Sequence, residues 1–364
     1  MTARIGLDAR KARDFGIGTY TRELAAAIAR DPGARSLDFT LFVRPGDEEL
    51  FAGLPANFST VVEPARPYSA AELTGFARRI RAARLDLFHA LHYVLPFGLR
   101  TPAVVTIHDL IHLQFPFDGR SPLRYPAARL LISRALSRAR AVLTATDSSR
   151  RDLEELSPTH AAKIRTVPHG TGRGFHPGIR QEEVARVLSA HGIEGQYALF
   201  VGGARPHKNL RRALDAFSRA AIHDFSLILA GPMPPDVAAL VASHPGARHI
   251  GIVEEADLPA LYGAATFLLY PSLAEGFGLP VAEAMACGTP VIAADIPVLR
   301  EVAGGAALLV DPRDPAAIAR AMVELHSDPG RRAGLSELGI ARAKNFSWDD
   351  SAARTLEVYR EVLG

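Results

Sequence analysis

The stretch that decides the fold is "ATFLLYPSLAEGFGLPVAEAMACGTPVIAAD", residues 265–295. It begins and ends with continuous apolar runs of strand length, which are typical of strands buried on both faces of a parallel sheet. Between them, Pro280 suits the first helical position, and Gly288 suits the C-terminal end of a short helix over "VAEAMAC". The order of strand, glycine loop, helix and strand predicts a parallel α/β unit.

Two glutamates, Glu275 in the loop and Glu283 in the first turn or so of the expected helix, flank the glycines of this unit. A loop at the carboxyl end of such a strand leads into a helix N-terminus, where backbone N–H groups favour an anion such as a phosphate. Two carboxylates beside a phosphate would repel it, unless they face hydroxyl groups on either side. A nucleotide sugar carries such hydroxyls on its ribose and its hexose. The structural alternative is a glutamate that only complements the helix dipole, beside a simple turn.

Strand-like runs alternate with helical patterns along the whole chain, which predicts two doubly wound parallel α/β domains. In the first half the expected strands are residues 4–9, 38–45, 85–91, 103–110 and 141–147. In the second half they are residues 197–203, 225–232, 248–253, 266–272, 290–295 and 306–312. The passage "VPHGTGRGFHP", residues 167–177, has the composition of a connector between the two domains.

Composition is that of an ordinary globular protein, and 364 residues with 48% hydrophobic residues suffice for two cores. No apolar run approaches the ~20 residues of a membrane span, and the N-terminal residues lack the apolar segment of a signal peptide. A cytoplasmic location is therefore expected. Cys287 is the single cysteine, which excludes an internal disulfide framework, and we expect it to serve packing.

Arginines gather in two stretches, "FARRIRAARLD" (76–86) and "LRYPAARLLISRALSRARA" (123–141), although the net charge is only +3. Such helices can lie on an anionic membrane surface, here the inner face, or they can be ordinary solvated helix faces. Both interpretations stay open. Nucleic acid is not expected as a partner, because basic and aromatic residues do not interleave and acidic residues nearly balance the basic ones.

Polar and small residues follow several of the expected strands. "DFGIGTY" (14–20) places Gly16 and Gly18 ahead of a helix, where they permit close approach to an anion. "TIHDL" (106–110) supplies His108, which can hydrogen-bond a sugar hydroxyl or carry a proton. "VGGARPHKNL" (201–210) places Arg205 and Lys208 beside a helix N-terminus, where two cations suit a diphosphate leaving group.

Other histidines near His108, namely His89, His92 and His112, allow a metal site to be drawn, but no partner has the spacing of a zinc motif. Buried, hydrogen-bonded histidines are the stronger interpretation of these three. No Walker loop, nucleophile elbow or Asp-x-Asp sequence at a strand end is present. We therefore expect neither a metal nor a separate cofactor.

Taken in order, these motifs resemble the retaining glycosyltransferases of family 4, which have the GT-B fold of two facing Rossmann-like domains. The Glu-x7-Glu element with its inner "GFGLP" is the specific part, and "DFGIGTY", "TIHDL" and "VGGARPHKNL" support it. The opening and "PHKNL" look most like the mannosyltransferase-like bacterial branch that builds cell-surface polysaccharide. The resemblance implies an N-terminal acceptor-side domain of residues 1–172, completed by a C-terminal helix over 347–364 that crosses back to it. Residues 173–346 would then bind the nucleotide sugar.

The resemblance also implies a role for each motif residue. Glu275 would face the transferred sugar, Glu283 would bind the ribose hydroxyls, and Lys208 would bind the diphosphate. His108 would lie near the donor sugar. Further contacts to the donor are implied for Gly16, Gly18, Gly276, Phe277, Gly278 and Leu279, and backbone near Ile252 would hold the base.

One position departs from the family pattern. Many members have an arginine directly after the "VG" of the second domain, whereas this chain has Gly203 there. Arg205, two residues on, is the candidate to reach the same diphosphate.

The implied activity is transfer of a hexose, with mannose favoured, from a GDP- or UDP-linked sugar to a hydroxyl of a glycan or lipid-linked acceptor. A departing phosphate oxygen would take the acceptor proton, so that anomeric configuration is retained without a separate base. A nucleotide-sugar epimerase of the same fold and a non-catalytic sugar-nucleotide binding protein are the alternatives. A dinucleotide-dependent dehydrogenase is disfavoured, because the third glycine of that fingerprint is absent.

Overall fold

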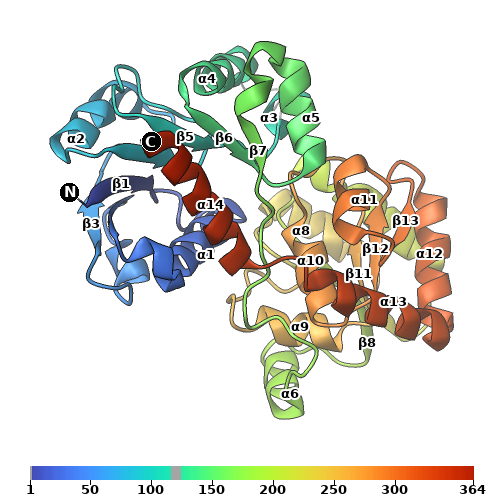
Figure 1. Ribbon diagram of the computed structural model, residues 1–364. Coiled ribbons are helices and arrows are strands. Elements are labelled where there is room, and N and C mark those ends of the chain that lie inside the picture. Colours follow the sequence, from blue (N-terminus) through green and yellow to red (C-terminus); the bar gives the residue numbers. More distant parts are fainter. Residues whose placement is uncertain (1, 116–123) are drawn as a thin grey trace. The chain divides into compact units, whose positions relative to one another are not determined.

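The computed structural model describes residues 2–115 and 124–364 (Figure 1). The chain divides into two compact units. Unit 1 comprises Met1–Gly170 and Ser347–Gly364, and unit 2 comprises Thr171–Phe346. Each unit has its own parallel sheet, so the expected pair of parallel α/β domains is confirmed.

The sheet of unit 1 has the strand order β3-β2-β1-β4-β5-β6-β7 in the described part of the chain, with all neighbours parallel. Its strands are β1 (Ala3–Asp8), β2 (Leu37–Val43), β3 (Phe58–Val62), β4 (Leu87–Ala90), β5 (Ala103–Thr106), β6 (Ala141–Thr144) and β7 (Ile164–Thr166). The order reverses between β1 and β4, which makes the carboxyl ends of these strands the expected position of a ligand site.

Helices connect these strands. They are α1 (Ile17–Arg30), α2 (Phe76–Ala82), α3 (Ile111–Gln114), α4 (Arg124–Arg138), α5 (Asp147–Leu156) and the terminal α14 (Trp348–Leu363). Short helical turns are η1 (Pro32–Ala34), η2 (Glu48–Phe51), η3 (Ala71–Gly75) and η4 (Pro158–Lys163). The arginine-rich stretch 123–141 corresponds to α4 and the start of β6, except that Leu123 lies outside the described residues.

Unit 2 has the strand order β10-β9-β8-β11-β12-β13, again all parallel. Its strands are β8 (Gln196–Val201), β9 (Phe225–Ala230), β10 (Ala247–His249), β11 (Phe267–Tyr270), β12 (Val291–Ala294) and β13 (Leu308–Val310). Its helices are α6 (Gln181–Ala190), η5 (Pro206–Lys208), α7 (Leu210–Ala220), α8 (Pro235–Ala242), α9 (Leu258–Ala264), α10 (Leu279–Ala286), α11 (Pro297–Ala303), α12 (Pro315–Ser327) and α13 (Pro329–Ala343). The order reverses between β8 and β11.

Both faces of the second sheet are buried. One core joins alternate strand residues, such as Phe200 and Leu229, to Leu214 of α7 and Met322 of α12. The residues between them on the strands, such as Leu199, are also fully buried, although they lie outside that core. Burial on both sides explains why these strands read as continuous apolar runs.

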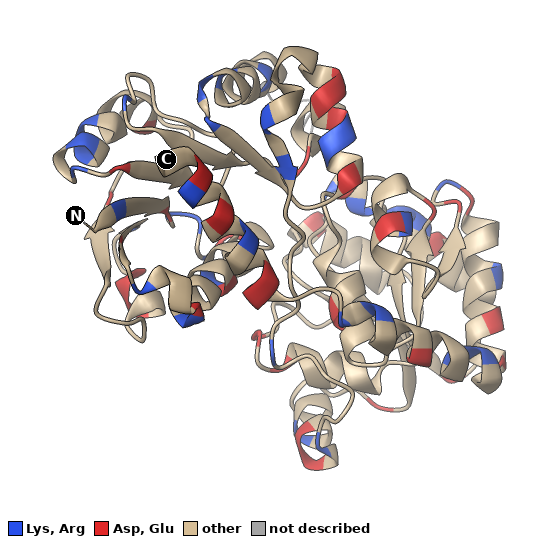
Figure 2. Ribbon diagram, in the orientation of Figure 1, with Lys and Arg blue, Asp and Glu red and all other residues tan. Residues whose placement is uncertain are grey.

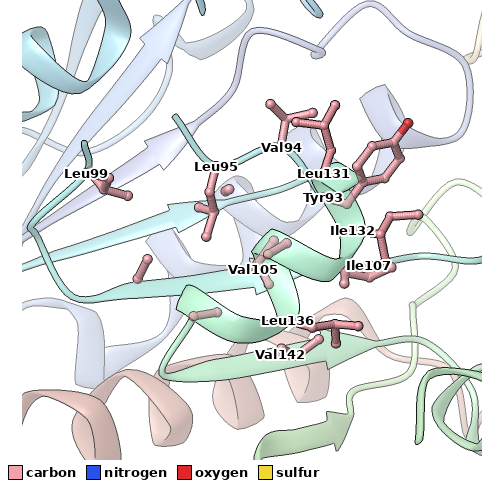
Figure 3. Packing of buried hydrophobic residues seen from close by; sticks show 14 of the residues in the cluster. Tyr93, Val94, Leu95, Leu99, Val105, Ile107, Leu131, Ile132, Leu136 and Val142 are labelled. Carbon is pink, nitrogen blue, oxygen red and sulfur yellow. The ribbon is translucent and has the colours of Figure 1, made fainter. Parts of the chain in front are cut away.

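In unit 1, α4 supplies a large part of the core. Figure 3 shows Ile132 and Leu136 of this helix gathered with Val105 of β5 and Val142 of β6. All four side chains have no exposed surface.

The terminal helix α14 returns to unit 1, as expected, and lies beside α1 (Figure 1). The Ser347 side chain accepts a hydrogen bond from the Asp350 backbone and so begins the helix. The Tyr359 hydroxyl lies 2.6 Å from Nδ1 of His89 in β4. The last helix is therefore part of the core of the first unit.

Two strands of unit 1 are absent from the sequence prediction. β3 is an edge strand in which most side chains are exposed, and β7 is an edge strand of three residues. Neither forms the long apolar run of a buried strand, so apolar patterning gives no signal for them. Among the described residues, no helix is long and apolar enough to cross a membrane.

Replacing Ile132 with alanine should lower the free energy of unfolding of unit 1 by about 2–5 kcal/mol, because it leaves a cavity in the core shown in Figure 3. The single tryptophan, Trp348, lies in unit 1 and reports its unfolding by fluorescence during denaturant titration. Leu130→Ala is the matched control on the same helix, because Leu130 is 61% exposed. Similar losses for the two variants would contradict this packing.

Candidate functional site

Lys208 and Glu275 meet at the point in unit 2 where the strand order reverses. Lys208 ends η5, shortly after β8, and Glu275 follows β11, the neighbouring strand. Because the carboxyl ends of parallel strands share one edge of the sheet, the two side chains converge there. Lys208 Nζ lies 2.7 Å from Glu275 Oε1, and the two side chains are only 16% and 9% exposed. The sequence-predicted cation and carboxylate are thus direct partners.

Tyr270 and Ser272 complete the surroundings of this ion pair. Lys208 Nζ donates a hydrogen bond to the Tyr270 hydroxyl at 2.6 Å. Burial alone would raise the pKa of Glu275, but the charge of Lys208 and hydrogen bonds from Lys208 and Ser272 hold it below the ordinary value. Burial and the adjacent Glu275 raise the pKa of Tyr270 well above its usual range. The group is therefore an ammonium, a carboxylate and a neutral phenol.

The glycine loop leads from Glu275 into α10. Gly276, Phe277 and Gly278 are buried, and the Phe277 ring makes an edge-on contact with Phe346 at 5.2 Å between centroids. Gly278 precedes the helix with a φ of 93°, and a Cβ there would lie 2.7 Å from Leu299 Cδ2. The positive φ favours glycine, and any other residue would also require the Leu299 side chain to move. Leu279 is the first residue of the helix.

Glu283 is the fifth residue of α10, so the expectation that it lies in the first turn needs correction to the second turn. It is 8% exposed, and its Oε2 accepts a hydrogen bond from the Tyr262 hydroxyl at 2.9 Å. Burial and the Glu283 charge raise the pKa of Tyr262 well above its usual range, which keeps it a donor. Dipole complementarity does not explain a buried carboxylate held in this way.

Cys287, just after α10, is buried, and burial raises the pKa of its thiol to about 12. It is therefore a neutral packing residue, as expected. Gly288 follows with a φ of 77°, the left-handed conformation of a helix C-terminal cap.

Arg205 and Ile252 are the more exposed members of the predicted set in unit 2. Arg205 precedes η5 in extended conformation with its side chain exposed, and Ile252 follows β10 with 63% of its surface exposed. Gly203 stands where many family members have an arginine. A Cβ there would lie 3.4 Å from Pro232 Cγ, an ordinary contact distance, so the backbone does not require glycine at this position. The roles of these residues stay predictions.

His108 lies in unit 1, two residues beyond the carboxyl end of β5. Its Nε2 donates to the Leu91 carbonyl at 3.1 Å, its ring stacks on His169 at 5.4 Å, and Tyr20 contacts it edge-on. Burial lowers the pKa of His108 to about 4, against a partial opposing effect of the hydrogen bond to Leu91. His108 is therefore a neutral imidazole near neutral pH, with Nδ1 as its acceptor atom.

Gly16 and Gly18 mark the start of α1, after β1. Gly16 has a φ of 66°, and a Cβ there would meet no atom within 4 Å. At Gly18, a Cβ would lie 2.6 Å from the Ala12 carbonyl oxygen, so this position excludes any side chain. Gly16 therefore provides an unusual backbone conformation, and Gly18 lets the Ala12 carbonyl approach the start of α1 closely.

The interpretation of His89, His92 and His112 as buried, hydrogen-bonded histidines agrees with the structure only in part. His89 is fully buried, with Nδ1 at 2.6 Å from the Tyr359 hydroxyl and Nε2 at 2.8 Å from Thr106 Oγ1. His92 is buried, but His112 is only half-buried, because it lies on the short surface helix α3. Within residues 2–115 and 124–364, no group of three or more His, Cys, Asp or Glu residues is arranged to hold a metal ion.

Four residues of these surroundings escape the sequence analysis, namely Tyr262, Tyr270, Ser272 and His169. Tyr270 and Ser272 stand at the end of a predicted strand, where polar residues are a usable signal. His169 lies in the passage interpreted as a connector. It follows β7, so recognition of that strand would have placed His169 at the same sheet edge as His108, although β6 lies between β5 and β7.

Comparisons with known proteins bear on both units. Residues 16–171 match the family described as Glycosyltransferase Family 4, and residues 195–328 match Glycosyl transferases group 1. O-antigen chain mannosyltransferase B of Escherichia coli is 33% identical over 285 residues, covering 75% of this chain and 74% of that protein. D-inositol 3-phosphate glycosyltransferase of Acidothermus cellulolyticus is 29% identical over 395 residues, covering 96% and 86%.

Solved glycosyltransferase structures share the GT-B fold with this chain. Sucrose-phosphate synthase from Thermosynechococcus elongatus has a TM-score of 0.80 at 22% identity, covering 99% of each chain. WaaG, a glycosyltransferase involved in lipopolysaccharide biosynthesis, has a TM-score of 0.78 at 15% identity, covering 98% of this chain and 99% of that one. HepE from Anabaena, in complex with UDP and glucose, has a TM-score of 0.76 at 18% identity, covering 99% and 100%.

The ion pair between Lys208 and Glu275 should contribute measurably to the stability of unit 2. Lys208→Met leaves the buried Glu275 without its cation and should lower the free energy of unfolding by about 3 kcal/mol. The double variant with Glu275→Gln should lose much less than the sum of the single losses, as measured by denaturant titration with circular dichroism. The same comparison of single and double variants at the exposed pair Arg300 and Asp295 is the control. There we expect a much smaller coupling free energy. Additive losses at Lys208 and Glu275 would refute the coupling.

The free energy of unfolding of unit 1 should fall as pH falls from the ordinary histidine value of 6.5 toward 4. Between these values the unfolded chain binds a proton that buried His108 does not, so acid favours unfolding. His108→Asn should reduce this slope by about 1.4 kcal/mol per pH unit, as followed by Trp348 fluorescence. His223→Asn, at an exposed position in unit 2, is the control. An unchanged slope in His108→Asn would mean that His108 titrates alike in both states.

Proposed function

Because the chain belongs to glycosyltransferase family 4, with a group 1 glycosyltransferase segment in its second unit, we propose a specific activity within that family. The protein is a retaining hexosyltransferase that moves a sugar, with mannose favoured, from a nucleotide diphosphate sugar to a hydroxyl group. The acceptor is a glycan or a lipid-linked glycan in cell-surface polysaccharide synthesis. The name of the Escherichia coli relative supports mannose, whereas the Anabaena structure holds UDP and glucose, so GDP and UDP both remain donor nucleotides to test.

The observation that carries this proposal is the convergence of Lys208 and Glu275 at the switch point of unit 2. Lys208 donates to the diphosphate, whose charge increases as the glycosidic bond breaks, and Arg205 contributes a second cation from the same loop. Glu275 faces the transferred sugar. Its paired ionised state, maintained by Lys208, suits a sugar that develops positive charge in the transition state.

Glu283 and the glycine loop hold the rest of the donor. Tyr262 fixes the position of the Glu283 carboxylate, which binds the ribose hydroxyls. Backbone N–H groups of Gly276, Phe277 and Gly278 approach the sugar and phosphate at the start of α10. Leu279 borders this loop, and backbone near Ile252 contacts the base.

His108 acts on hydroxyl groups as a neutral acceptor, because Nε2 is engaged by Leu91 and Nδ1 remains the accepting atom. Gly16 and Gly18 contribute no side chains at the start of α1, which suits contact with an anionic group. The acceptor hydroxyl attacks from the face that the diphosphate leaves, and the departing phosphate oxygen takes its proton. This sequence retains configuration and uses neither a metal nor a protein base.

The enzyme works in the cytoplasm at the inner face of the membrane, where a lipid-linked acceptor would be available. Support comes from α2 and α4, whose Arg78, Arg81 and Arg129 are exposed, and from Leu130, which is 61% exposed. Exposed cations beside an exposed leucine suit peripheral contact with anionic lipid.

The first test is thermal stabilisation by GDP-mannose and UDP-glucose without added metal, because a ligand of the folded state raises the melting temperature. With the donor that stabilises the protein, Glu275→Ala should lower turnover by about 100-fold and leave nucleotide affinity nearly unchanged. Glu283→Ala should instead weaken nucleotide binding by about 10-fold or more. Glu337→Ala, at an exposed position on α13, is the control for both.

Each alternative has its own signature in these measurements. An epimerase would convert or release donor without an acceptor, and a non-catalytic binding protein would be stabilised without turnover. Equal loss of nucleotide affinity in Glu275→Ala and Glu283→Ala, without a separate loss of turnover, would count against the assigned roles.

A further inference from the structure

A basic pocket of about 470 Å³ opens in unit 1 at the amino ends of β5, β6 and β7. Its lining includes five cationic side chains, from Arg100, Arg134, Arg138, Arg140 and Lys163. Among the described residues that line it there is no carboxylate side chain. Figure 2 shows the arginines of α4, the helix that supplies part of this wall, in blue.

The cations of this basic pocket repel one another. Burial and the neighbouring Arg138 lower the pKa of Arg134, and burial and the neighbouring Arg140 lower the pKa of Lys163. Across residues 2–115 and 124–364, none of the five forms an ion pair with a carboxylate. Holding like charges together without a counter-charge costs free energy, which an anion would offset.

Internal contacts explain only part of the cluster. Lys163 Nζ donates to the carbonyl oxygens of Ala139 at 2.8 Å and Ser137 at 3.3 Å, so it caps the end of α4. Arg134 Nη2 donates to Pro96 at 3.1 Å, and its guanidinium lies 4.3 Å from the centre of the Phe97 ring. The Nε of Arg134, however, is buried without a hydrogen-bond partner in the described structure.

Such contacts do not account for the other three cations of the pocket. Arg100, Arg138 and Arg140 are exposed and lie around the two half-buried cations, Arg134 and Lys163. Five cations, one of them with an unsatisfied buried N–H group, match the several oxygens of a phosphate group. The pocket is also distinct from the candidate active site. Its lining includes Ala103, the first residue of β5, whereas His108 follows the opposite end of that strand.

We propose that the basic pocket binds the phosphate group of a small anionic molecule, at a site separate from Lys208 and Glu275. The shared ligand chemistry is the phosphate, which can come from a soluble molecule or from the headgroup of an anionic phospholipid. The buried side chains of Leu95 and Leu99 line the same pocket and provide an apolar wall beside the charges.

The test compares the whole protein with Arg138→Gln/Arg140→Gln and with the control Arg35→Gln/Arg66→Gln. Both double variants remove two exposed arginines from unit 1, but only the first pair lines the pocket. Inorganic pyrophosphate, the soluble probe, is titrated by calorimetry, and vesicles of phosphatidylglycerol or phosphatidylcholine are tested by co-sedimentation. Any binding of pyrophosphate at Lys208 and Arg205 is the same in all three proteins and cancels in the comparison.

The pocket variant should bind the effective probe about tenfold more weakly, whereas the control should match the unmodified protein. Loss with pyrophosphate identifies a soluble phosphate ligand, and loss with phosphatidylglycerol vesicles alone identifies a lipid headgroup. Arg100→Gln, in a loop, repeats the test without altering a helix end, in case the double variant unfolds. Equal binding by the pocket and control variants to both probes, or no binding of either probe, would overturn the proposal.

Discussion

The structure of the candidate site depends on one interaction, the pairing of Lys208 with Glu275. Neighbouring parallel strands deliver the two residues to the same sheet edge, and burial makes each charge unfavourable without the other. Tyr270 and Ser272 satisfy further hydrogen bonds of the pair, so that Glu275 stays ionised in spite of its burial. The glycine loop and α10 then continue from Glu275 and fix the place of Glu283.

Two strand ends of the candidate site differ in electrostatic character. The end of β11 in unit 2 leads to the ion pair of Glu275 with Lys208, whereas the end of β5 in unit 1 leads to a neutral histidine, His108, in contact with His169 and Tyr20. Under the proposed function this division is chemically sensible. The charged diphosphate and the developing positive charge of the sugar need fixed charges, while an acceptor hydroxyl needs only an oriented hydrogen-bond partner.

Much of the fold could be predicted from sequence, because strands buried on both faces leave long apolar runs separated by glycine loops. The same patterning fails for β3, whose side chains face solvent at a sheet edge, and for β7, whose sequence Ile-Arg-Thr has no continuous apolar run. Glu275, Glu283 and Lys208 could be selected from their positions after strands. Their partners could not, since the contact of Tyr262 with Glu283 depends on how α9 packs against α10. The contact of His108 with His169 could not be predicted either, because the two residues follow strands that β6 separates.

The return of α14 to unit 1 also has a consequence for synthesis of the protein. Unit 2 is one continuous segment, Thr171–Phe346, inserted within unit 1. On the ribosome, the sheet of unit 2 can therefore be completed while unit 1 still lacks the helix that bears Trp348 and Tyr359. Until that helix emerges, His89 has no Tyr359 hydroxyl to contact and α1 lacks its packing partner. The domain translated first is thus the one that finishes folding last.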